Sequence, residues 1–132
     1  MKIEWVVLCR EAQQLEPGGP ADMVQAGLDY FELASLPHVL RVWLVFRLSG
    51  RPEDVVAEHE FCLEVFDPDL RSLEGKQLGT LTIGEAKEIS RPGWSLRPLV
   101  SLALDLPLQT RGAHTIRVRI GDAVGEAPLY IA

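Results

Sequence analysis

Hydrophobic and polar residues alternate along most of this chain, in short runs separated by residues that are typical of turns. Alternation with a period of two indicates β-strands that bury one face, and no long stretch has the periodicity of a helix. The sequence therefore predicts an all-β protein, an antiparallel β-sandwich of the immunoglobulin-like kind with about seven to eight strands. The expected strands cover residues 2–10, 22–33, 39–48, 57–66, 78–89, 99–106, 113–120 and 123–131.

The run at residues 39–48 has the clearest two-faced pattern. Its even-numbered positions are Leu, Val, Leu, Phe and Leu, so we expect this face to lie in the core. Its odd-numbered positions carry Arg41, Trp43 and Arg47, on the face that the pattern leaves free. A Trp between cations is typical of an interface anchor, and it also fits a cation–π stack that covers its own sheet.

The run at residues 57–66 has the inverted pattern, with glutamates on most of its even-numbered positions. If it pairs with the preceding run, one register places Arg47 opposite Glu58 and Arg41 opposite Glu64. Each opposite-charge pair across two strands adds about 0.2–1 kcal/mol. We therefore expect these two strands to be neighbours in that register.

The last two runs are predicted to form a hairpin. Gly121 and Asp122 suit a two-residue turn, because glycine tolerates the positive φ of its first position. The resulting register keeps apolar residues on one face and places Arg117 opposite Glu126 on the other. Pro128 has no N–H to donate, so we expect it at an edge or on an unpaired side of the last strand.

Length and composition indicate one soluble globular domain that covers residues 1–132. Apolar residues make up 47% of the chain and charged residues 24%, which argues against disorder. The net charge of -6 and the lack of a Lys/Arg run argue against nucleic acid as a partner. The apolar run from Trp5 to Cys9 is too short for a signal peptide or a membrane span, so we expect a cytoplasmic protein without a membrane partner.

Two cysteines are too few for a disulfide framework, and we expect Cys9 and Cys62 to remain separate thiols. The histidines, His38, His59 and His114, show no metal-ligand spacing with each other or with a cysteine. His114 is expected to be structural, donating to a carbonyl between residues 108 and 111. No nucleophile elbow and no phosphate-binding glycine loop is present, so we predict no catalytic residue, metal or cofactor.

The segment "FDPDL" contains Asp67 and Asp69 and is consistent with two interpretations. A turn in which Asp67 accepts hydrogen bonds from its own backbone is the expected one. The alternative is a site for Ca²⁺ or a small polar ligand in the 67–70 loop. A calcium ion takes six or more oxygen ligands, and no second acidic loop supplies them.

Three surfaces are candidates for contact with a protein partner or a second copy of the chain. The first is the face with Arg41, Trp43 and Arg47. The second is Trp94 in the loop "SRPGW", which also fits a lid over the end of the core. The third is the sheet edge beside Pro128, because an unpaired strand edge accepts further strands.

The chain resembles a family of short bacterial proteins known only as a domain of unknown function. The similarity lies in "MKIEWVVLC", in "LPHVLRVWLVFRL" followed by "HEFCLEVFDPD", and in "RGAHTIRVRIGD", whereas residues 70–98 depart from the pattern. The resemblance implies an all-β sandwich in a bacterial cytoplasm and brings no activity or catalytic residue. The sequence thus predicts a non-enzymatic interaction or structural module, with a ligand-binding sandwich second and an enzyme third.

Overall fold

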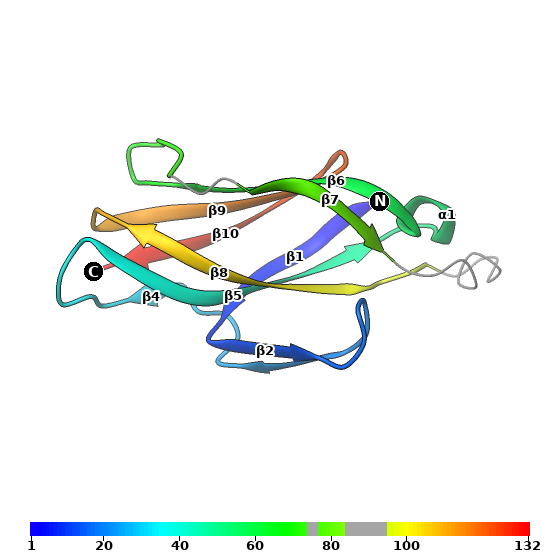
Figure 1. The fold of residues 1–132 in the computed structure, drawn as a ribbon, viewed down its shortest axis with the longest axis horizontal. Helices are drawn as coiled ribbons and strands as arrows, with labels where there is room; N and C mark the ends of the chain where they lie inside the picture. Colours follow the sequence, from blue (N-terminus) through cyan, green and yellow to red (C-terminus); the bar gives the residue numbers. More distant parts are fainter. Residues whose placement is uncertain (74–76, 84–94) are drawn as a thin grey trace.

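The structure is a computed structural model that describes residues 1–73, 77–83 and 95–132, and almost all of its regular structure is β-strand (Figure 1). This confirms the all-β prediction. No helix in the described ranges is long and apolar enough to cross a bilayer. The elements are β1 (Lys2–Cys9), β2 (Glu11–Gln14), β3 (Ala21–Val24), β4 (Tyr30–Phe31), β5 (His38–Ser49), α1 (Pro52–Val55), β6 (Ala57–Phe66), β7 (Gln77–Ile83), β8 (Leu99–Leu108), β9 (Gly112–Ile120) and β10 (Ala123–Ile131).

The strands form two larger sheets and one ribbon. The three-stranded sheet has the order β1-β5-β8, the five-stranded sheet has the order β4-β10-β9-β6-β7, and β2 pairs with β3. All pairs are antiparallel except the short parallel pair of β4 with β10. The expected strand at 22–33 is two separate strands, β3 and β4, because neither of its faces is continuously apolar.

The predicted pairing of residues 39–48 with residues 57–66 is wrong. β5 lies between β1 and β8, and β6 lies between β9 and β7. Arg41 faces Asp105 of β8, with Nη1 3.2 Å from Oδ2, whereas Glu64 faces Arg117 of β9. Arg47 faces Trp5 and places its guanidinium carbon 5.8 Å from the centre of that ring. Arg41 does pair with an opposite charge across strands, but its partner is Asp105 and not Glu64.

The predicted hairpin of β9 and β10 is confirmed. Its register is the expected one, Gly121 has a φ of 57°, and Arg117 Nε lies 2.8 Å from Glu126 Oε1. Pro128 faces Thr115 of β9 on one side. On its other side β10 pairs only through its last two residues, so Pro128 lies on an unpaired stretch among the described strands, as predicted.

The main core contains side chains from both larger sheets. All five even-numbered residues of β5 from Leu40 to Leu48 are buried, as predicted. They share one cluster with inward-facing residues of β6, β9 and β10. β1 packs close to Gly125 of β10, where Ile3 and Val6 fill the space that a side chain at position 125 would need.

The outer face of the three-stranded sheet is covered in part by the β2–β3 ribbon, which lies below the rest of the molecule in Figure 1. A second buried cluster joins Cys9, Ala12, Val45 and Leu99, with Trp43 packed against it. Val45 on the odd face of β5 is fully buried. The expectation that this whole face is free is therefore wrong, because an element from elsewhere in the chain covers its middle.

Candidate functional site

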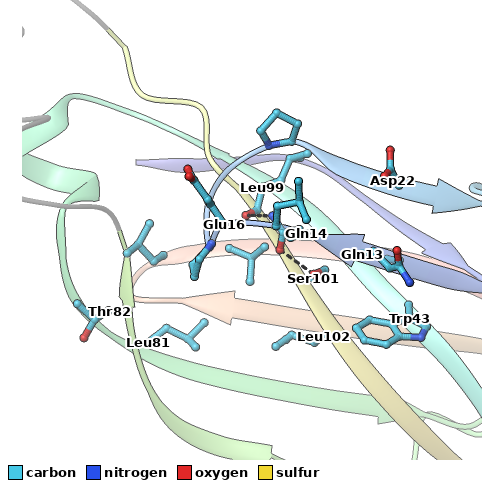
Figure 2. A pocket seen from close by; sticks show the side chains of 17 residues that line it. Gln13, Gln14, Glu16, Asp22, Trp43, Leu81, Thr82, Leu99, Ser101 and Leu102 are labelled. Carbon is cyan, nitrogen blue, oxygen red and sulfur yellow. Dashed lines mark hydrogen bonds between the residues drawn. The ribbon is translucent and has the colours of Figure 1, made fainter.

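A groove of about 990 Å³ lies where the β2–β3 ribbon, the end of β7 and the first half of β8 meet (Figure 2). We call it the β8 groove. Trp43 of β5 completes its wall. Its lining residues are Ala12, Gln13, Gln14, Leu15, Glu16, Pro17, Gly18, Pro20, Asp22, Trp43, Leu81, Thr82, Ile83, Leu99, Val100, Ser101 and Leu102.

The backbone of β8 has a definite orientation in this groove. Leu48 of β5 donates to the carbonyl of Pro98, so this carbonyl points toward β5. The backbone N–H and C=O of Leu99 point away from β5. The N–H donates to Gly18 O at 3.2 Å, and the carbonyl accepts from Gln14 Nε2 at 3.0 Å. Because orientation alternates along an antiparallel strand, Ser101 also directs its N–H and C=O away from β5.

Gln14 fixes the ribbon to β8. Its Nε2 donates to Gly19 O at 2.9 Å as well as to Leu99 O. Its Oε1 accepts a hydrogen bond of 2.7 Å from Ser101 Oγ. Both ends of one half-buried amide are thus used, which holds the 15–20 loop over the start of β8.

The groove has two chemically different sides. The side toward the core is apolar and is formed by Leu81, Val100 and Leu102, which are partly buried and pack against the main core. The outer side carries Trp43 together with the polar groups of the ribbon. In Figure 2 strand β8 passes between Leu81 and Trp43, so the groove spans both faces of this strand.

The charged residues in the described lining of the groove have one sign. Glu16 and Asp22 are the charged residues among the lining residues that the structure describes, and both are exposed. Neither has an ion-pair partner in the part of the chain that the structure describes. The described lining residues include no histidine, cysteine, lysine or arginine, and no metal-binding group of side chains occurs in the described ranges. The groove therefore offers apolar surface and negative charge for binding.

The predicted interface residues of β5 lie on its odd-numbered face in different surroundings. Trp43 is half-buried in the groove wall, and Arg47 is half-buried beside Trp5. Arg41 is exposed at the other end of the strand and pairs with Asp105. Trp94 lies outside the described residues.

The loop at 67–70 is a turn, as expected. Asp67 Oδ1 accepts hydrogen bonds of 2.9 Å from the backbone N–H groups of Asp69 and Arg71. This carboxylate oxygen is used by its own loop. The arrangement is an Asx turn that closes the end of β6.

The histidines and cysteines lie apart from the groove lining. His114 is buried, with Nδ1 3.0 Å from Gly112 O, one residue beyond the segment predicted to supply that carbonyl. His59 places Nε2 3.0 Å from Val55 O. Both cysteines are free: Cys9 is buried in the second cluster, and Cys62 is half-buried on the Glu-bearing face of β6.

Most of the groove could not be anticipated from the sequence. Leu15 is fully exposed at its rim, and Ser101 and Leu102 line it from opposite faces of β8. Leu15 stands directly before "EPGGP", and an apolar residue beside a turn is too common to mark a site. No protein-family model, curated protein or solved structure matches the chain, so the assignment of function depends on this geometry.

Proposed function

We propose that this chain is a single antiparallel β-sandwich of the immunoglobulin-like kind that acts as a non-enzymatic, cytoplasmic protein-interaction module. Support for the sandwich comes from the buried cluster that contains side chains of both larger sheets. Support for an interaction role comes from the β8 groove, whose described lining offers apolar and charged surface.

One observation carries this proposal: a groove with an apolar side toward the core and a Trp in its wall has a fully exposed leucine at its rim. Leu15 has 102% relative exposure, and Leu81, Val100 and Leu102 leave part of their apolar surface in the groove. Apolar surface of this kind, bordered by polar residues, is typical of protein interaction sites. The 67–70 loop has no comparable observation in favour of a ligand, because Asp67 is engaged by its own turn.

Site-specific photo-crosslinking tests the proposal with a matched pair of positions. A benzoylphenylalanine is placed at Leu15 or at Leu70, which are both strongly exposed loop leucines, and only Leu15 lines the groove. Crosslinking in the native cell should trap one protein partner, or a second copy, from position 15 and not from position 70. Equal products from both positions, or none from position 15, would contradict an interaction through this groove.

A further inference from the structure

We propose that the β8 groove binds an extended segment of a protein partner, which adds as a strand to the edge of β8 and alternates apolar with basic side chains. This inference rests on the interaction function proposed above and specifies the chemistry of the partner. Three independent features lead to it: the free backbone groups of β8, the two-sided lining of the groove, and the sign of its charge.

The first feature is the backbone of the edge. β8 is the last strand of its sheet, and β5 is its only strand neighbour among the described elements. Ser101, Ala103 and Asp105 follow the same alternation as Leu99 and therefore point their N–H and C=O groups away from β5. Pro107 has the same orientation and lacks an N–H, which fits an unpaired side. The unpaired edge of β8 begins after Leu99, which is bound to Gly18, and extends to Pro107. This edge is a template for an added strand.

The second feature is the lining. Successive side chains of a strand point to opposite faces, so a strand beside Ser101 places alternate side chains toward the core and toward the outer face. The core side offers Leu81 and Leu102, and the outer side offers Trp43 with the ribbon. The groove spans both faces of β8, as an added strand would. Apolar residues of the partner fit the core side, and polar or charged ones fit the outer side.

The third feature is charge. Glu16 and Asp22 line the groove without an ion-pair partner in the described ranges, whereas Asp105 farther along β8 is paired with Arg41. A second copy that paired edge to edge would present the same acidic residues, and each chain carries a net charge of -6. Lysine or arginine on the partner gives complementary charge. The observations therefore favour a basic segment over a second copy.

The test uses synthetic peptides as probes and fluorescence anisotropy as the measurement. The probe is a labelled nonapeptide of alternating lysine and valine. The controls are an alternating glutamate–valine peptide and a peptide of the same lysine–valine composition with the two residue types segregated. We expect both controls to bind at least about tenfold more weakly than the alternating lysine–valine probe. Binding of the glutamate peptide with equal affinity would overturn the assigned charge.

Two variants at one position isolate the backbone contact. Ser101→Ala and Ser101→Pro both remove the hydroxyl that donates to Gln14, and only Ser101→Pro also removes the outward N–H. This N–H does not belong to the β5–β8 ladder, so the fold should be retained in both variants, which circular dichroism checks. We expect Ser101→Pro to bind the probe about tenfold more weakly than Ser101→Ala.

A third variant tests the charge without changing the strand edge. Glu16→Lys combined with Asp22→Lys should weaken binding of the lysine–valine probe by about tenfold or more and reverse the preference toward the glutamate peptide.

Equal affinity of Ser101→Pro and Ser101→Ala for the probe would overturn strand addition, while groove-specific crosslinking from Leu15 would still support the interaction function. A concentration-dependent dimer that Ser101→Pro disperses would replace the basic segment by a second copy. Failure of the Leu15 crosslinks together with failure of the probe would reject both proposals.

Discussion

Ser101 Oγ donates a hydrogen bond of 2.7 Å to Gln14 Oε1, which joins two residues that are 87 positions apart in the sequence. The same Gln14 amide donates to Leu99 O and to Gly19 O. This side chain is therefore the polar link between the β2–β3 ribbon and the edge of β8. The shape of the groove depends on it, because the ribbon forms the groove's outer side.

Gln14→Ala should release the ribbon from β8. The change leaves Ser101 Oγ and Leu99 O without these partners, and loss of such hydrogen bonds costs about 1–3 kcal/mol in the free energy of unfolding. Hydrogen exchange of the amides in residues 11–24 should accelerate more than exchange in β9. Gln13→Ala is the matched control, because Gln13 is exposed and its side chain has no hydrogen bond among the described residues. Similar exchange in both variants would show that Gln14 does not hold the ribbon.

Gly125→Ala should destabilise the domain. A Cβ at this position would lie 2.6 Å from Val6 Cγ2 and 2.7 Å from Ile3 Cγ2, which belong to branched side chains that yield little. Such overpacking costs about 1–3 kcal/mol in the free energy of unfolding, measurable with denaturant. Gly79→Ala on exposed β7 meets nothing within 4 Å and should stabilise the domain by about 0.5–1 kcal/mol. Opposite signs for these two substitutions are the expected outcome.

The sequence was sufficient where structure is local. The β9–β10 hairpin follows from one turn and one alternating pattern, because a two-residue turn at Gly121 determines the register of every later pair. The Asp67 turn is local in the same way, since its acceptor and donors are at most four residues apart. In such segments the short chain connection leaves few alternative registers or hydrogen-bond partners.

The sequence was insufficient where partners are distant. Glu64 and Asp105 are both chemically suitable partners for Arg41, and the structure places Asp105 opposite it. A cross-strand charge pair of about 0.2–1 kcal/mol cannot decide between sheet topologies, which are determined by burial of whole strand faces. The groove is likewise formed by segments that are distant in the sequence. The sequence pattern identifies Trp43 as a candidate interface residue but does not predict that the β2–β3 ribbon packs against it and leaves it half-buried.

The two cysteines should differ in reactivity. Burial raises the pKa of the Cys9 thiol, so this thiol stays protonated and unreactive in the folded protein at about pH 8. Cys62 is half-buried on an outer face and is the accessible thiol. Iodoacetamide followed by mass spectrometry should show labelling at Cys62 at least about tenfold faster than at Cys9. In Cys62→Ser, labelling should require denaturant, and rapid labelling of this folded variant would contradict the buried position of Cys9.

The raised pKa of Cys9 also predicts a dependence of stability on pH. A thiol whose folded-state pKa lies above the unfolded value favours folding at lower pH, and this contribution is lost as the pH rises through the folded-state value. Unfolding measured in denaturant at alkaline pH should therefore show a steeper loss of stability for the parent chain than for Cys9→Ala. Parallel curves for the two proteins would contradict this prediction.

Arg97 and Glu4 supply a pH dependence at the acidic end. Arg97 donates from Nη2 to Glu4 Oε2 at 2.8 Å and from Nε to the same oxygen at 3.2 Å, which joins the segment before β8 to β1. The hydrogen bond from Arg97 lowers the pKa of the Glu4 carboxyl. A carboxyl with a lowered folded-state pKa contributes stability above its unfolded pKa and loses it as the pH falls through the folded-state value. Arg97→Gln should therefore be less stable than the parent chain at about pH 7, and the difference should shrink toward about pH 3.

Denaturant unfolding across this pH range, with Glu4→Gln as the matched control, measures the contribution of the pair. Glu4→Gln removes the titrating carboxyl, so adding Arg97→Gln to it should have an effect that does not change with pH. The pair is exposed on the Arg97 side, so a salt concentration well above physiological should reduce the difference at neutral pH. A difference between the parent chain and Arg97→Gln that stays constant from about pH 7 to about pH 3 would show that Glu4 does not titrate against Arg97.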